Sequence, residues 1–150
     1  MGVSWRPIYV TFTGGDSDLK GTVRLPTDVK TISAVELQGY RLNGLDGDLA
    51  AALYINEIAT NNNTLLSNYE HLNGAFYICV CSGNNNYTSG WHANTDGIRC
   101  QEFDPRKVPQ LTFEVKRVTA SPLETQSIPK PSGTENRNVQ LWLRIRVECD

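Results

Sequence analysis

The chain of 150 residues carries 14 basic and 16 acidic residues, for a formal net charge of −2, and 39% of its residues are hydrophobic. A chain of this length fits one domain that buries roughly 68–70% of its unfolded surface, so its core needs no disulfide or metal. The balanced charge argues against a nucleic-acid partner, and no apolar run approaches the roughly 18 residues of a membrane span.

Four cysteines stand at Cys79, Cys81, Cys100 and Cys149. Their spacing does not match a zinc site, and neither of the two histidines stands at ligand spacing. No charged segment followed by an apolar core opens the sequence, so secretion is not expected. We therefore expect free, mostly buried thiols in a protein made in a reducing compartment, without a metal or another cofactor.

The first half of the chain predicts a short arm and three strands. Residues 1–7 form an N-terminal arm, and the alternation of apolar and polar residues predicts a first strand at 8–12. A second strand at 20–25 stops at a proline. The third strand, at 29–42, is long and rich in β-branched residues, and Gly39 within it indicates a bulge or a bend.

Four shorter strands follow, separated by segments rich in Gly, Asn and Pro. The strand at 49–55 is ambiguous, because its run of alanines would equally suit a helix. Three further strands are expected at 75–81, 98–103 and 111–115.

The clearest pattern is the closing stretch, residues 139–149. One parity carries aliphatic residues and a cysteine, and the other carries polar residues and one tryptophan. Successive side chains of a strand point to opposite faces, so this stretch predicts a long strand with a buried and an exposed face. Trp142, Arg144 and Arg146 share the exposed parity. They would lie in a subunit interface, where Trp and Arg are favoured, or be covered by a loop.

Eight strands with recurrent turn signals and no convincing helix predict an all-β fold, an eight-stranded single jelly roll over residues 8–150. Its two packed antiparallel sheets have Greek-key connections. The first, last, third and sixth strands form one sheet, and the second, seventh, fourth and fifth form the other. The last strand therefore lies between the first and the third.

Two long loops carry apolar and aromatic residues suited to contacts. The loop at 82–97 contains Tyr87 and Trp91, which could stack on a sugar ring, anchor the loop, or enter a subunit interface. The loop at 120–137 adds two apolar anchors. The candidate interface therefore comprises Tyr87, Trp91, Leu123, Ile128, Trp142, Arg144 and Arg146.

Two acidic pairs, Asp16 with Asp18 and Asp46 with Asp48, are expected at the same end of the fold. Carboxylates are hard ligands that suit calcium, but acidic turns are also a common kind of solvated loop. No spacing indicates a Ser-His-Asp or Cys-His site, so neither a catalytic residue nor enzyme activity is expected.

Three stretches carry a resemblance: 31–42 leading through a turn into 49–58, Gln101-Glu102-Phe103-Asp104-Pro105 before 111–118, and the closing Val-x-Leu-x-Leu-x-Ile-x-Val strand. Together they resemble the single-jelly-roll penton (minor capsid) proteins of polinton-like viruses, virophages and large eukaryotic DNA viruses. The resemblance is one of strand pattern and spans nearly the whole chain.

The resemblance implies a structural capsid protein whose homopentamer closes the fivefold vertices of an icosahedral shell. The shell itself would be built mainly from double-jelly-roll trimers of a major capsid protein. The chain would reside in the virion, at the capsid vertex, after assembly inside the host cell, and it would have no catalytic residues. The alternative is a carbohydrate-binding, lectin-like jelly-roll module. A third interpretation, a trimeric cytokine-like jelly roll, would require secretion.

Overall fold

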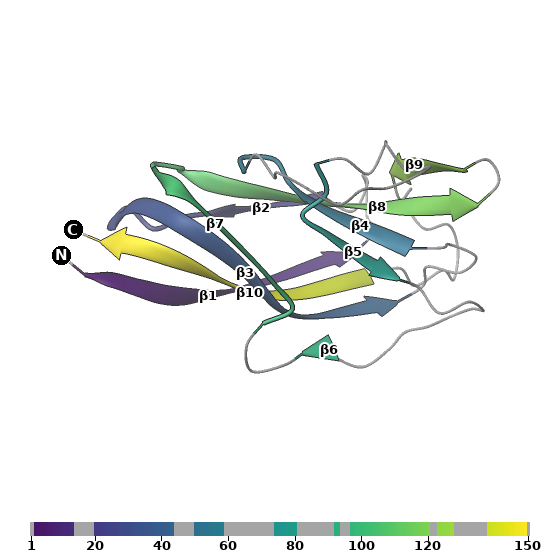
Figure 1. Cartoon of the computed structure of the whole chain (residues 1–150), viewed down its shortest axis with the longest axis horizontal. Coiled ribbons are helices and arrows are strands. Elements are labelled where there is room, and N and C mark those ends of the chain that lie inside the picture. Colours follow the sequence, from purple (N-terminus) through teal and green to yellow (C-terminus); the bar gives the residue numbers. More distant parts are fainter. Residues whose placement is uncertain are drawn as a thin grey trace.

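The computed structural model describes residues 2–13, 20–43, 50–58, 74–80, 92–93, 97–120, 123–127 and 138–149. These residues form ten strands and no helix, and the strands lie in two facing sheets (Figure 1). Within these ranges there is accordingly no helix long and apolar enough to cross a membrane.

The first sheet is built around the closing strand. Its order is β1 (Val3–Thr13), β10 (Asn138–Cys149) and β3 (Val29–Asn43), and both β6 (His92–Ala93) and β7 (Arg99–Arg106) pair with β3. The predicted position of the closing strand is confirmed, because β10 pairs antiparallel with β1 on one side and with β3 on the other.

The second sheet runs β2 (Lys20–Arg24), β8 (Gln110–Ala120), β4 (Ala50–Ile55) and β5 (Tyr77–Val80), and β9 (Leu123–Ser127) pairs with β8. The ambiguous alanine-rich segment is therefore a strand, β4. All the pairings are antiparallel. The eight predicted strands occupy the predicted sheets, which confirms the jelly roll.

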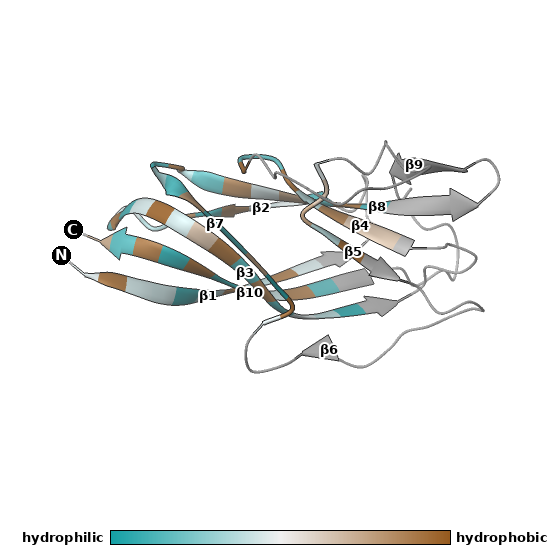
Figure 2. Ribbon diagram, in the orientation of Figure 1, coloured by the Kyte–Doolittle hydropathy of each residue, from teal (hydrophilic) through white to brown (hydrophobic). Residues whose placement is uncertain are grey.

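The core lies between the two sheets, and the alternation along the strands fills it. Figure 2 shows apolar and polar bands alternating along β1, β3 and β10. Each aliphatic side chain buried in this way contributes roughly 1.5–3 kcal/mol, so β10 alone stabilises the fold considerably. Four of its inward residues are at most 2% exposed: Leu141, Leu143, Ile145 and Val147.

Three extra residues explain the imperfect alternation of β3. Its register with β10 shifts at Lys30, at Ser33 and at Gln38. The shift at Gln38 lies beside Gly39, where a bulge or bend was expected, and confirms that expectation. An extra residue moves the side chains that follow it to the other face. The shifts at Lys30 and Ser33 offset each other, and Glu36 lies opposite Arg144 on the outer face of the sheet.

The structure corrects the prediction of an N-terminal arm at residues 1–7. β1 begins at Val3, so most of residues 1–7 are strand. Two features hid this extension: Pro7 breaks a strand pattern, and Arg6 occupies an inward parity. Both are accommodated in the structure, because β1 is an edge strand in which a proline costs little, and the Arg6 side chain pairs with Asp28.

Three other segments differ from the prediction. The strand expected at 98–103 continues past Asp104-Pro105 to the end of β7 at Arg106. β6 lies within the loop expected at 82–97, and β9 lies within the loop expected at 120–137. All of these additions lie along the margins of the sheets, where the pattern of burial is weakest.

Candidate functional site

The outer face of β1 and β10 carries a pair of stacked aromatic rings. Tyr9 and Trp142 are partners in the register of the two strands. Their rings are nearly parallel, at 9°, with centroids 6.0 Å apart. Tyr9 is 66% exposed. Cross-strand aromatic pairs contribute roughly 0.2–1 kcal/mol, so this pair stabilises the sheet while remaining open to contacts.

Trp5 lies further along the same face of β1, with two arginines of β10 above its ring. The guanidinium carbon of Arg144 is 4.4 Å from the ring centroid, and that of Arg146 is 5.7 Å away. A cation over an indole ring gains about 0.5–1 kcal/mol at an exposed site. We refer to these five residues as the outer-face cluster: Trp5, Tyr9, Trp142, Arg144 and Arg146.

A buried carboxylate orients Arg144. Its Nε donates to Oε1 of Glu36 at 3.0 Å, and its Nη2 donates to Oε2 at 3.2 Å. The Glu36 side chain is only 6% exposed, and the amide of Gln38 also donates to Oε1. A carboxylate removed from water is costly unless it is paired and hydrogen-bonded. The pair therefore holds the Arg144 guanidinium in one orientation over the Trp5 ring.

Gly97 closes one side of the Glu36 carboxylate. It has a φ of 85°, a left-handed conformation that favours glycine. A β-carbon at this position would lie 2.7 Å from Cγ of Glu36. The next residue holds the approach in place, since the N–H of Ile98 donates to the carbonyl of Leu37 at 2.6 Å. Position 97 therefore favours glycine for two reasons: the backbone has a left-handed conformation, and the Glu36 side chain leaves no room for a β-carbon.

Arg146 joins β10 to β3 and β7. Its Nε donates to Oγ of Ser33 and its Nη1 donates to Oε1 of Glu102, both at 2.9 Å. Nearby, partial desolvation raises the pKa of the exposed Cys100 thiol, and the charges of Glu36 and Glu102 raise it further. A thiol with a raised pKa is a poor nucleophile. The Cys100 thiol is therefore less reactive than an ordinary cysteine.

The structure brings together three of the seven predicted interface residues. Trp142, Arg144 and Arg146 all face outward from β10, as their parity predicted, and they meet the aromatic residues of β1. The other four lie where no side chain is described: Tyr87, Trp91, Leu123 and Ile128.

The possible calcium ligands remain untested. Both acidic pairs, at 16–18 and 46–48, fall outside the described residues. Among the residues that are described, no three His, Cys, Asp or Glu side chains gather where they could hold a metal ion.

Sequence reasoning missed the contribution of β1 to the cluster. Trp5 and Tyr9 share a parity with Val3 and Pro7, so extending the strand through the proline would have revealed an aromatic and apolar stripe on its outer face. Glu36 was missed for a different reason, because three register shifts along β3 obscure which side of the sheet each of its residues faces.

No protein-family model and no curated protein matches the chain. Among solved structures, the crystal structure of the infectious bursal disease virus VP2 subviral particle shares 12% identity, and the alignment covers 97% of this chain. It covers 42% of the VP2 chain, with a TM-score of 0.19. So low a score carries no argument, and the fold assignment rests on the strand order and pairing described above.

Proposed function

We propose that the chain is a structural protein of an icosahedral viral capsid, a penton whose homopentamer closes the fivefold vertices. In this proposal its neighbours are double-jelly-roll trimers of a major capsid protein. It resides in the virion after assembly in the host cell.

The outer-face cluster is the observation that carries the proposal. Jelly rolls serve as viral capsid and lectin domains, so the fold alone leaves both classes open. A cluster of Trp, Tyr and Arg on a sheet face has the composition of the core of a subunit interface. A ring of five requires one head-to-tail contact repeated around an axis, and this face is one candidate flank for it.

The geometry favours a protein contact over a sugar. Arg144 lies over one face of Trp5 at 4.4 Å and Trp142 lies parallel to Tyr9, so a sugar ring could stack only on the opposite faces of these rings. The arginines are also already paired with Glu36 and with Glu102. A prearranged surface of this kind suits a partner of matching shape, because little side-chain freedom is lost on binding.

Native mass spectrometry over a concentration series tests the proposal. We expect pentamers of the natural protein and loss of pentamers for the Trp5→Ala/Trp142→Ala double variant, with an unchanged far-UV circular dichroism spectrum. Lys107→Ala, an exposed change in the turn between β7 and β8, is the control and should assemble normally.

Two results would contradict the penton assignment. The first is a protein that stays monomeric at high concentration and is missing from the fivefold vertices of particles that contain it. The second is specific glycan binding that Trp5→Ala abolishes, which would favour the lectin-like alternative.

A further inference from the structure

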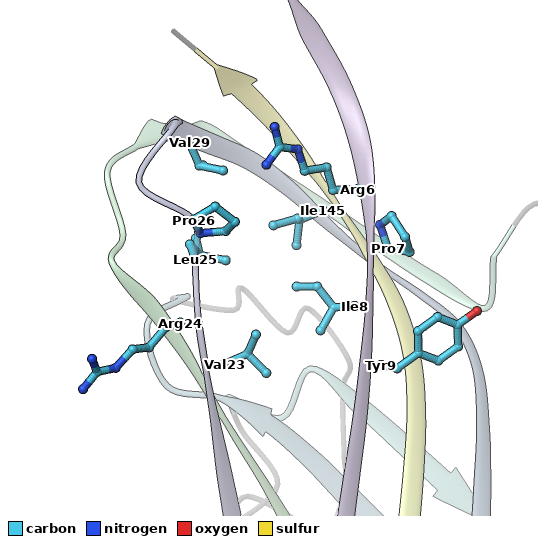
Figure 3. Close-up of a pocket in the computed structure, with 10 residues that line it drawn as sticks. All are labelled: Arg6, Pro7, Ile8, Tyr9, Val23, Arg24, Leu25, Pro26, Val29 and Ile145. Carbon is cyan, nitrogen blue, oxygen red and sulfur yellow. The ribbon is translucent and has the colours of Figure 1, made fainter.

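A small apolar pocket opens between the edges of the two sheets. Its volume is about 280 Å³, and it lies between β1 and β2. Figure 3 shows Ile8, Val23, Leu25 and Ile145 pointing into this space, whereas Tyr9 points away from it. Pockets for drug-sized ligands measure roughly 300–1,000 Å³. This one is therefore better matched to individual aliphatic side chains.

The backbone of β2 has an open edge beside the pocket. The N–H of Leu25 donates to the carbonyl of Pro109, so the odd-numbered residues of this strand turn their backbone groups toward β8. Thr112, the partner of Thr22, turns its own N–H to Glu57 and its carbonyl to Asn56. Backbone direction alternates along a strand, so Thr22 turns its N–H and C=O away from β8.

The open edge of β2 therefore presents the backbone groups of Lys20, Thr22 and Arg24. No described strand pairs with it. An unpaired edge of this kind is a template for an extended segment of another chain. β1 on the other side of the pocket is less suitable, because Pro7 has no N–H, and a proline in an edge strand points its nitrogen to the open side.

The two strands that border the pocket carry only positive charge. Their 16 residues, 11 in β1 and 5 in β2, include Arg6, Lys20 and Arg24 but no Asp or Glu. Arg6 is paired with Asp28 at 2.6 Å. No ion pair with another described residue engages Lys20 or Arg24. The charge complementary to this rim is negative.

We infer that the β2 edge is a docking site for an extended acidic segment of a partner protein. The segment adds a strand beside β2 by hydrogen bonding to the backbone of Thr22 and Arg24. Its alternate side chains are aliphatic and enter the pocket against Val23 and Ile8, since alternate residues of a strand share a face. The intervening side chains are carboxylates that face Lys20 and Arg24. This site is separate from the proposed pentamer contact and does not depend on it.

Amide hydrogen exchange in the free protein tests the geometry of the edge. In the ¹⁵N-labelled protein we expect the amides of Thr22 and Arg24 to exchange rapidly and those of Gly21 and Val23 to be protected by β8. Protection of Thr22 and Arg24 at all concentrations would overturn the proposal, because the edge would already be occupied. Protection that appears only at high protein concentration would also overturn it, since the occupant would be a second copy of this chain.

The binding test uses a synthetic heptapeptide in which valine alternates with glutamate. We expect it to shift the amide resonances of Thr22 and Arg24 and to slow their exchange. Two control peptides separate the contributions: one replaces each glutamate with lysine, and one is N-methylated at alternate amides and so cannot pair with an edge. Both should bind at least about tenfold more weakly, because each lost hydrogen bond or charge contact costs roughly 1 kcal/mol.

Variants of the chain complete the test. Thr22→Pro removes the N–H that points to the open edge and leaves the hydrogen bonds between β2 and β8 intact. Val23→Phe fills the pocket. Each variant should bind the glutamate peptide about fivefold or more weakly than the natural protein does, whereas Thr22→Ala should bind it as tightly as the natural protein. The proposal is overturned if the glutamate peptide fails to bind at millimolar concentration, or if it binds the natural protein, Thr22→Pro and Val23→Phe equally. The proposal is also overturned if the N-methylated or the lysine peptide binds the natural protein as tightly as the glutamate peptide does. This comparison does not require the Thr22→Pro variant to fold.

Discussion

Two arginine–carboxylate pairs in this molecule have similar geometry and very different surroundings. Arg6 and Asp28 approach to 2.6 Å, with side chains 36% and 52% exposed. Arg144 and Glu36 are farther apart, at 3.0 Å, but the Glu36 side chain is only 6% exposed. The Arg6–Asp28 pair is therefore the shorter of the two, whereas the Arg144–Glu36 pair is the more buried.

Burial should decide which of the two pairs contributes more to the stability of the fold. Exposed ion pairs contribute little, because water and salt screen them and two long side chains must be held still. A buried carboxylate depends on its partner, since loss of that partner leaves a charge without compensation. Glu36 also accepts from Gln38 and lies against Gly97. The following changes test this contrast, beginning with the largest expected effect.

Arg144→Met should lower the free energy of unfolding by about 2–3 kcal/mol, because Glu36 keeps its buried charge and loses its main donor. Urea denaturation measures the loss. The double variant Arg144→Met/Glu36→Gln is the control, and it should recover at least about half of the lost stability, since the charge is gone. A double variant as unstable as Arg144→Met would show that packing of the arginine, rather than the buried charge, is responsible.

Gly97→Ala should cost about 2 kcal/mol. Part of this is the left-handed backbone, at a φ of 85°, and part is overlap with the Glu36 side chain. In a Glu36→Ala background the overlap disappears, and the cost should fall to the backbone contribution of about 1 kcal/mol. Thermal unfolding of the four proteins separates the two contributions. An equal loss in both backgrounds would argue against close packing of Gly97 on Glu36.

Trp5→Ala should cost about 1 kcal/mol, because Arg144 and Arg146 lose the ring beneath them. Val3→Ala is the matched control on the same face of β1. Val3 is 67% exposed, so its loss should change stability by less than about 0.5 kcal/mol. Urea denaturation of both variants gives the comparison. Equal losses would mean that Trp5 contributes only as part of the strand.

Asp28→Asn should have the smallest effect, and one that depends on pH. The hydrogen bond from Arg6 lowers the pKa of Asp28 below its ordinary value of 3.8. A carboxyl whose pKa is lowered on folding contributes stability above its unfolded pKa, and the contribution disappears as the pH falls through the folded pKa. The Tm difference between the natural protein and Asp28→Asn should therefore shrink below pH 3.8. A difference that does not change with pH would exclude this pair as its origin.

Much of the fold could be predicted because alternation and burial agree in its centre. The inward residues of β10 alternate without interruption, and both of its neighbours were predicted correctly. The same parity placed Trp142, Arg144 and Arg146 on the outer face. These residues lie where a sheet is packed on one side, so periodicity alone determines the direction of each side chain.

The rest could not be predicted, because it depends on contacts between distant parts of the chain. Arg6 follows the inward parity of β1, and its charge is met by Asp28, 22 residues further along the chain. Glu36 faces outward beside Arg144 in a strand whose register with β10 shifts three times. Gly97 is required by a side chain far away in the sequence. In each case, the position of one residue is explained by a second residue that only the assembled sheets bring close to it.

The central position of β10 has a consequence for synthesis of the protein. β1 and β3 do not pair with each other in the finished sheet, and β10 pairs with both. A ribosome adds about 5–20 residues per second, so the nascent chain presents β1 and β3 for several seconds before β10 emerges. Their apolar faces and unpaired edges are open to other chains during that interval. Productive folding therefore depends on whether chaperones cover these strands or crowded polysomes bring them together.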